Sequence, residues 1–257
     1  MWSVARAACL VAAGLLAGTA HAGEIRILVI GGALASNCNA HAFQPAAGVY
    51  QLGLDGAEKP AGDPFDWADC QGGAQWVPLG EALLRLGRAD RVVFLPVGVQ
   101  RARAADWLTD SPARTRLQAA LAMARAHHMR FDYALWQQGM ADAGTPRSEH
   151  ATQVDAVIKS INRQVRIGKW LIARQSGCAG QPDPDISSAQ LQAARDPLHR
   201  RFPGPDVDAL GAAYRVDGCR LNRAGQEEMA RRWVRAMGEA DAEYTRYQKE
   251  SLLHYFR

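Results

Sequence analysis

The sequence predicts one three-layer α/β/α domain built on a parallel sheet. Short apolar, β-branched runs alternate along the chain with stretches of helical spacing, which is typical of strands covered on both faces by helices. The length of 257 residues suits a single domain of ordinary size. Hydrophobic residues make up 48% and charged residues 22%, the balance of a globular chain rather than a disordered one.

The elements follow in order from the apolar runs. We expect strands at 24–30, 91–97, 133–136 and 170–173. We expect helices at 79–86, 115–128, 149–165, 188–195 and 222–237. The segment 48–73, rich in Gly, Pro and Asp, is interpreted as one long loop. Residues 240–257 form an amphipathic tail that either packs on the body as a helix or frays.

The first 22 residues have the features of a secretory signal peptide. Arg6 supplies the positive start, residues 7–17 form an uncharged apolar run, and Ala20-His21-Ala22 is a small-x-small cleavage signal. An uncleaved anchor is the alternative, although the run is short for a membrane-spanning helix. We therefore predict a mature domain over 23–239, periplasmic or secreted, with no membrane span after cleavage.

Four of the five cysteines remain after that cleavage, since Cys9 leaves with the signal peptide. An even number in an exported chain indicates two disulfides, and free buried thiols are the alternative. Three connectivities exist. We favour Cys38–Cys70 with Cys178–Cys219, because each pair would join two loops on the same rim of the sheet.

Charge and composition exclude several classes of function. The net charge is only +4, and the Arg residues are scattered among Asp and Glu without interleaved aromatic residues, so no nucleic-acid binding is predicted. No two cysteines have the spacing of zinc ligands, and no motif implies a metal or an organic cofactor.

Four sequence blocks follow the predicted strands or precede the last helix. They are Gly31-Gly32-Ala33, then Pro96 to Trp107, then Gln137-Gln138-Gly139-Met140-Ala141-Asp142, and last Asp217-Gly218-Cys219-Arg220. Ligand sites in parallel sheets lie at the carboxyl ends of the strands. The four blocks are therefore candidates for one site.

Together these blocks resemble the SGNH (GDSL-like) hydrolases, and among them the carbohydrate-acetylesterase branch that includes the sialic-acid-specific acetylesterases. In that family the first block carries a Ser nucleophile, the third has the sequence His-Gln-Gly-Glu-Ser-Asp, and the last is Asp-Gly-x-His. The resemblance covers most of the mature chain. It implies a flavodoxin-like fold, a Ser-His-Asp triad, and an oxyanion hole made of backbone N–H groups and one amide side chain.

The chain departs from the family at the two positions that carry the chemistry. The resemblance places Ala33 at the nucleophile position and Arg220 at the base position, and only Asp217 of the triad is retained. Ala has no oxygen to attack with, and a guanidinium does not give up its proton in a protein. Losing one triad member leaves about 10³–10⁴-fold acceleration over water, so with two replaced we predict no working esterase.

The resemblance also assigns residues to the oxyanion hole and the binding cleft. Gln100 and Arg101 stand where the family has a Gly-Gly pair, and Met140 and Ala141 replace polar residues. The candidate set is Gly98, Gln100, Gln138, Gly139, Asn37 and Trp107. The rings of Trp67, Trp76 and Trp107 suit either sugar stacking or apolar packing. Asp217 and Arg220, three residues apart, are expected to form an ion pair or to stay solvated.

Three functions follow from these observations. The leading one is a catalytically degenerate protein that binds an acylated carbohydrate or polysaccharide, or a protein partner, in the former cleft. Arg101 and Arg220 would favour an acidic sugar.

The first alternative is an active esterase with Ser36 as nucleophile and His41, His150 or His199 as base. The competing interpretation of Ser36 is that it caps a following helix together with Asn37. The second alternative is a structural or partner-binding protein that uses the aromatic tail.

Overall fold

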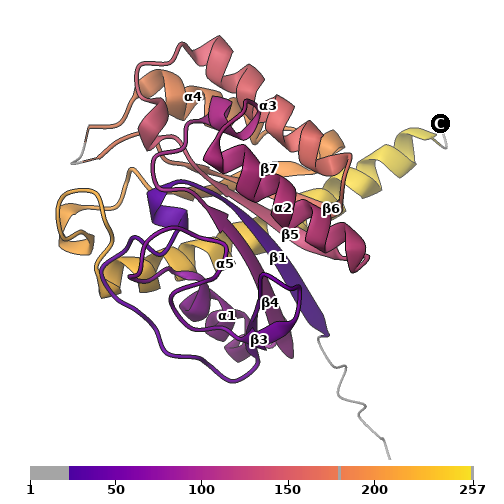
Figure 1. Ribbon diagram of the computed structural model, residues 1–257. Coiled ribbons are helices and arrows are strands. Elements are labelled where there is room, and N and C mark those ends of the chain that lie inside the picture. Colours follow the sequence, from indigo (N-terminus) through magenta and orange to yellow (C-terminus); the bar gives the residue numbers. More distant parts are fainter. Residues whose placement is uncertain (1–22, 179–180, 256–257) are drawn as a thin grey trace, which may run out of the picture.

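The computed structural model describes residues 23–178 and 181–255, so the signal peptide predicted over 1–22 lies outside the described residues. A seven-stranded sheet forms the middle layer (Figure 1). Its spatial order is β3 (Glu58–Pro60), β2 (Val49–Leu52), β4 (Arg91–Gly98), β1 (Glu24–Gly31), β5 (Arg130–Gln137), β6 (Arg166–Arg174) and β7 (Arg201–Asp206). Neighbours are parallel except β2 and β3, which are antiparallel.

Helices cover both faces of the sheet, which confirms the three-layer fold (Figure 1). Helices α1 (Trp76–Arg85) and α5 (Arg223–Tyr255) pack on one face. Helices α2 (Pro112–Ala126) and α3 (Arg147–Asn162) pack on the other, and α4 (Pro184–Ala193) lies against α3. Of the described helices, none combines the length and the apolar character needed to cross a membrane.

Strand β1 lies at the centre because its apolar run is buried from both sides. Residues 27–30 have no exposed surface. In register with its two neighbours, Gly31 pairs with Gly98 of β4 and with Gln137 of β5. These three strands therefore end side by side, and the segments that follow them share one rim of the sheet.

Some element predictions were wrong. The segment 48–73 is not one loop, because it contains β2 and β3, which add an edge to the sheet beside β4. Strand β7 was missed because its sequence, RFPGPD, carries two prolines and a glycine; an edge strand tolerates these residues because one of its sides needs no partner. Strands β5 and β6 begin three and four residues before the predicted positions, with polar first residues.

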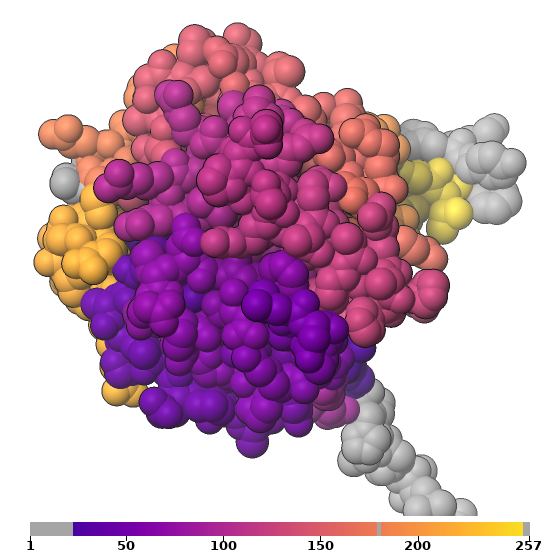
Figure 2. All heavy atoms as spheres, viewed as in Figure 1, coloured from indigo at the N-terminus to yellow at the C-terminus, as the bar shows by residue number. Residues whose placement is uncertain are grey.

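The segment predicted as a tail continues helix α5 without a break, so the boundary at 239/240 falls inside a helix. Ala240 is buried and Tyr244 packs on the core. The carboxylate of Asp241 accepts hydrogen bonds from the Tyr133 hydroxyl at 2.8 Å and pairs with Lys169 at 3.0 Å and with Arg88. The last turns of α5 project from the body (Figures 1 and 2).

The structure pairs the cysteines as favoured from the sequence. Cys38 bonds to Cys70 with Cα atoms 5.1 Å apart, and Cys178 bonds to Cys219 with Cα atoms 4.7 Å apart. The first bond joins the segment after β1 to the end of the loop after β3. The second joins the segment after β6 to the turn that precedes α5. Cys219 belongs to the last sequence block, and Cys38 follows the first block.

Candidate functional site

The site is built where β4, β1 and β5 end. The backbone N–H of Gly32 donates to the carbonyl of Gln137 at 3.1 Å, and Ala33 then begins a short 3-10 helix, Ala33–Ala35. A Cβ on Gly31 would lie 2.1 Å from the same carbonyl oxygen, so a glycine is required for this close approach. Ala33, at the nucleophile position of the resemblance, is partly exposed at this turn.

The turn that carries Asp217 and Arg220 is held against the Ala33 turn by Asn39. The side chain of Asn39 donates to the carbonyl of Leu34 at 3.1 Å and accepts the N–H of Leu221 at 3.2 Å. The N–H of Ala40 donates to the carbonyl of Leu221 at 2.9 Å. The structure thus brings the first and last sequence blocks together through the buried Asn39 side chain and the Ala40 N–H.

Asp217 and Arg220 form the ion pair that their spacing suggested. Arg220 Nε lies 2.7 Å from Asp217 Oδ2, and Asp217 Oδ1 accepts the backbone N–H groups of Arg220 at 2.7 Å and Cys219 at 3.1 Å. The hydrogen bonds from Arg220 lower the pKa of Asp217. Both oxygens of the carboxylate are therefore engaged within its own turn, while the pair faces solvent.

Ser36 lies away from the exposed part of the turn. It has no exposed surface, and its hydroxyl donates to the carbonyl of Gly32 at 2.9 Å. A Cβ on Gly98 would lie 2.2 Å from Ser36 Oγ, so the hydroxyl sits tightly against the end of β4. The glycine at position 98 is thus required for packing on Ser36.

The prediction that Ser36 and Asn37 cap a following helix is wrong. Ser36 ends the 3-10 helix, and the next helix, α1, begins only at Trp76. The amide of Asn37 donates to the carbonyls of Phe65 and Ala68 at 2.9 and 3.0 Å and accepts the N–H of Phe65 at 2.8 Å. Asn37 therefore anchors the loop that follows β3.

The three histidines weighed as bases make other contacts. His199 is largely exposed and pairs with Asp196 at 2.7 Å. The ring of His41 packs edge-on against Phe43. His150 is fully buried in α3, with its Nδ1 3.6 Å from Asp142 Oδ1, too far for a hydrogen bond.

The backbone N–H at the second block is already engaged. Gln100 N–H donates to Asp69 Oδ2 at 2.9 Å, and Asp69 Oδ1 receives a hydrogen bond from Arg116 at 2.6 Å. Arg116 also donates to the carbonyl of Gly98 at 2.6 Å. The charge of Arg116 holds Asp69 in place, and Asp69 in turn holds the loop that carries Gln100.

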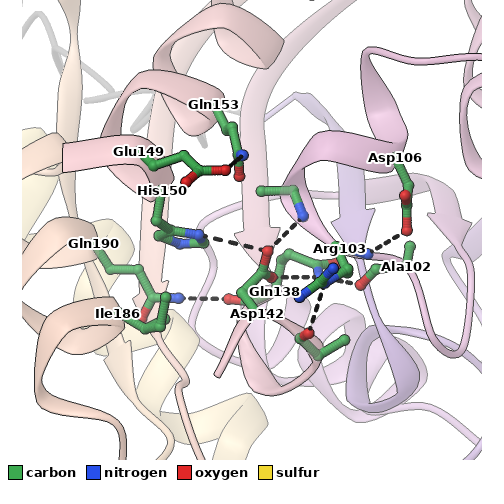
Figure 3. A network of polar contacts seen from close by, with 12 residues as sticks. Ala102, Arg103, Asp106, Gln138, Asp142, Glu149, His150, Gln153, Ile186 and Gln190 are labelled. Carbon is green, nitrogen blue, oxygen red and sulfur yellow. Dashed lines mark hydrogen bonds and ion pairs between the residues drawn. The ribbon is translucent and has the colours of Figure 1, made fainter. Parts of the chain in front are cut away.

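The amide of Gln138, from the third block, is part of a buried network (Figure 3). Its Nε2 donates to the carbonyl of Ala102 and, at 3.0 Å, to Asp142 Oδ2. Asp142 Oδ1 accepts the N–H of Ala104 at 2.7 Å. Gln190 of α4 donates to the backbone carbonyl of Gln138 at 2.6 Å. Every donor of this amide thus faces a protein acceptor.

Gly139 is required by packing. Its φ is +146°, and a Cβ there would lie 2.0 Å from the carbonyl oxygen of Gln175. Gln175 is itself held by Gln190, which accepts the Gln175 N–H at 2.8 Å. The third block is therefore held against the segment after β6 and against α4.

A polar hollow of about 230 Å³ borders the network between the segment after β4 and the start of α3. Its polar lining comes from Arg103, Asp142, Thr145, Glu149 and Gln153. Figure 3 shows Arg103 next to Gln138 and Asp142, with Glu149 and Gln153 bonded to each other at 2.9 Å. These are groups that suit the hydroxyls of a small polar ligand.

The tryptophans weighed for sugar stacking are core residues. Trp107 is 2% exposed, Trp67 is 6% exposed, and both belong to the core on the α2–α3 face of the sheet. Trp76 is fully buried beneath α1, where its Nε1 donates to the carbonyl of Ala35. The placement of Trp107 in the binding cleft is therefore wrong, because its ring fills the space between the sheet and the helices.

Two residues of this region were not singled out from the sequence: Asp69 and Gln190. Asp69 stands next to a cysteine in a loop, and its role depends on Arg116, which is 47 residues away. The only sequence signal for Gln190 is its position on the apolar side of a helix, where polar residues are uncommon. That position predicts that the side chain is buried, but it does not predict its hydrogen-bond partner.

Comparisons with known proteins agree with the fold. No family model and no curated protein matches the sequence. Among solved structures, a protein from Arabidopsis thaliana aligns with a TM-score of 0.63 at 15% identity, over 82% of this chain and 96% of that one. The acetylxylan esterase Axe2 from Geobacillus stearothermophilus aligns with a TM-score of 0.55 at 14% identity, over 84% and 95%. A protein described as a GDSL-like lipase, from Parabacteroides merdae, aligns with a TM-score of 0.54 at 12% identity, over 84% and 96%.

This chain has the fold of the SGNH (GDSL-like) hydrolases. The structures it resembles include an acetylesterase, and the alignments span nearly the whole of those chains. At such low identity the likeness establishes the fold, and the chemistry has to be argued from the residues at the rim.

Proposed function

We propose that this protein is exported, does not hydrolyse esters, and binds an acylated carbohydrate in the cleft where its structural relatives carry a catalytic site. The observation that carries the proposal is the pair of turns joined by Asn39. These turns carry Ala33 and Arg220, which the resemblance assigns to the nucleophile and base positions, and neither side chain supplies a nucleophilic oxygen or a proton acceptor.

The surroundings of these turns support the absence of hydrolysis. The Gln100 N–H and the Gln138 amide, two donors that the resemblance assigns to the oxyanion hole, donate to protein acceptors instead. Ser36, the alternative nucleophile, is buried against Gly98. A rearranged esterase would have to expose Ser36 and bring a base to it, and His41, His150 and His199 each contact other residues instead.

Two observations support a carbohydrate ligand and export. Axe2, named as an acetylxylan esterase, shares the fold over most of both chains. The exposed arginines beside the rim, Arg101 and Arg220, favour a sugar that carries negative charge. Export is supported by the two disulfides, which form in oxidising compartments.

The test of catalysis is hydrolysis of an aryl acetate and of acetylated xylo-oligosaccharides by the purified chain 23–257. We expect no turnover above that of buffer, with Axe2 assayed beside it as a positive control. The Ser36→Ala variant should behave like the wild type. Turnover that disappears in Ser36→Ala would instead establish the rearranged esterase.

The test of binding is isothermal titration of the same protein with acetylated xylo-oligosaccharides and with an O-acetylated sialic acid. Arg220→Gln should weaken binding of the acidic sugar more than that of the neutral one, because it removes a cation at the rim. The exposed Arg246→Gln provides the matched control. Absence of binding to either sugar would refute the carbohydrate function.

A protein partner is the second candidate, supported by the projecting end of α5. Leu252 and Leu253 are 59% and 65% exposed there. Deleting residues 240–257 would also remove Asp241 and its contacts, so the sharper variant is Leu252→Glu with Leu253→Glu. If a partner binds this end, the double variant should lose its co-purification from exporting cells while keeping the wild-type melting temperature. Unchanged recovery would eliminate this candidate.

A further inference from the structure

The polar hollow between the segment after β4 and the start of α3 is open to solvent and distinct from the two triad turns. Among the residues that the structure describes, neither Ala33 nor Arg220 lines it. Its volume is about 230 Å³, below the roughly 300–1,000 Å³ of pockets that take drug-sized ligands. The hollow therefore suits a ligand of about the size of one sugar ring.

Arg103 brings unbonded hydrogen-bond donors to the hollow (Figure 3). Its Nε donates to the carbonyl of Ala141 at 3.3 Å, and its backbone N–H donates to Asp106 Oδ2 at 2.7 Å. Neither of its Nη atoms bonds to a residue that the structure describes. The guanidinium is thus held at its base, while its outer edge can donate to a ligand.

Helix α3 brings unbonded acceptors to the same hollow. Gln153 Nε2 donates to Glu149 Oε1 at 2.9 Å, and this bond orients both side chains. In the described part of the chain no donor bonds to Glu149 Oε2 or to Gln153 Oε1. Thr145, just before α3, adds a hydroxyl that can donate or accept.

Asp142 adds a buried negative charge at the edge of the hollow. It is 1% exposed, and its oxygens accept the Ala104 N–H at 2.7 Å and Gln138 Nε2 at 3.0 Å. The charged groups of the lining are then two carboxylates, of Asp142 and Glu149, and one guanidinium, of Arg103. This balance disfavours a ligand carboxylate, because like charges repel.

We propose that this hollow binds one uncharged sugar ring through its hydroxyls. A hydroxyl both donates and accepts, so neighbouring hydroxyls of a ring match the donors of Arg103 and the acceptors of Glu149 and Gln153. Ala105 and Pro146 supply apolar surface for the C–H groups of the ring. The site goes beyond the proposed function, which concerns the turns of Ala33 and Arg220, and it does not depend on it.

The first test follows the titration of ¹⁵N-labelled wild-type chain 23–257 with D-glucose and with D-galactose by NMR. The Nε–H of Arg103 and the side-chain amide of Gln153 report on the hollow, and the Nε–H of Arg220 reports on the former cleft. We expect the first two signals to shift and to saturate. If they stay unchanged with both sugars, the inference is overturned. A shift of the Arg220 signal alone would then favour the former cleft and leave the proposed function standing.

The second test compares each sugar with its uronate, which has the same ring and a carboxylate in place of one CH₂OH group. The start of α3 lines the hollow, and helix starts attract anions, so this comparison separates an uncharged ligand from an anion. Half-saturation of the Arg103 and Gln153 signals should need at least about tenfold more uronate than sugar. Equal or tighter binding of the uronate would define an anion site and overturn the inference.

The third test uses two variants with matched controls. Glu149→Gln keeps the size of the side chain but replaces a charged acceptor by a neutral one, so half-saturation should need about tenfold more sugar. Glu250→Gln, the same change at an exposed position, should need no more than wild type. Ala105→Trp fills the hollow and should abolish the shifts, whereas Ala242→Trp on the exposed side of α5 should keep them. Unchanged binding in either folded hollow variant would overturn the inference.

Discussion

The resemblance assigns Asp217 to the triad, but its partners in the structure differ from those that the resemblance implies. In the resemblance this carboxylate orients a histidine, whereas here it holds the Arg220 guanidinium and two backbone N–H groups of its own turn. The pair is exposed to solvent, and exposed ion pairs contribute about 1 kcal/mol or less. The pair therefore matters less for stability than for reactivity, because it offers no general base.

Restoring the two missing triad residues should restore little activity. We predict that Ala33→Ser with Arg220→His hydrolyses an aryl acetate at least about 10²-fold more slowly than Axe2 assayed beside it. The reason is that Gln100 N–H and the Gln138 amide stay bonded to Asp69 and Asp142, and removing one oxyanion donor costs about 10²–10³ in kcat. A rate comparable to that of Axe2 would show that these donors are free.

Asp63 predicts a pH dependence of stability. Burial raises the pKa of this carboxyl to about 7, against the lowering effect of the hydrogen bonds from the Phe43 and Ala74 N–H groups. Between about pH 4 and 7 the folded state then binds more protons than the unfolded state, so the free energy of unfolding decreases as pH rises.

The measurement is urea denaturation of wild type and Asp63→Asn at pH 5 and pH 8. Wild type should be more stable at pH 5, by an amount on the order of a few kcal/mol at most. Asp63→Asn should show a smaller difference between the two pH values. An equal pH dependence in both proteins would assign the effect to another group.

The resemblance assigns Ala33 and Arg220 to the triad positions from their places in the sequence blocks, but residue types do not give side-chain surroundings. Ser36 and Trp107 stand at plausible places in the sequence blocks, yet both are buried. Their burial follows from contacts with distant segments: Gly98 packs on Ser36, and the core beside α2 and α3 surrounds Trp107. A single sequence carries no signal for such pairings.

At the scale of elements, α5 is anchored near its midpoint by Asp241. Asp241 faces Tyr133, Lys169 and Arg88, which come from β5, β6 and the segment before β4. We predict that Asp241→Asn lowers the free energy of unfolding by about 1–3 kcal/mol, since it leaves these partners without their acceptor charge. Urea denaturation measures the loss, and Glu250→Gln at the exposed end of α5 should cause none.

The Cys38–Cys70 bond should be a large contributor to stability. It closes a loop of 32 residues that includes β2 and β3. Replacing both cysteines by serine should lower the free energy of unfolding by about 2–5 kcal/mol, the usual cost of removing a native disulfide. Comparing urea denaturation of this variant with that of wild type under oxidising conditions tests the value. An unchanged midpoint would mean that the bond is not formed in solution.

Elements with long apolar runs are predictable, and short edge strands are not. The runs of β1 and β4 are buried on both faces, so their composition specifies them. Strands β2, β3 and β7 are four, three and six residues long and contain polar residues or prolines. Their extended form comes from pairing with β4 and β6, which local sequence does not record.

At the scale of the whole molecule, the fold follows from the alternation of strands and helices. The predicted cellular compartment follows from the N-terminal segment instead. We predict that the protein expressed in full in a bacterial host is recovered from the periplasm or medium with Gly23 as its first residue. N-terminal sequencing of the recovered protein checks the cleavage site. Recovery of an uncleaved chain from the membrane fraction would support the anchor instead.

The bridge made by Asn39 uses main-chain atoms of Leu34 and Leu221, and no side-chain atom of Ala33 or Arg220. The spacing of the two turns is therefore independent of which side chains stand at the triad positions. Mutations there can accumulate without loosening the scaffold. A protein built in this way can change the side chains at positions 33 and 220 one at a time and keep the two turns in place.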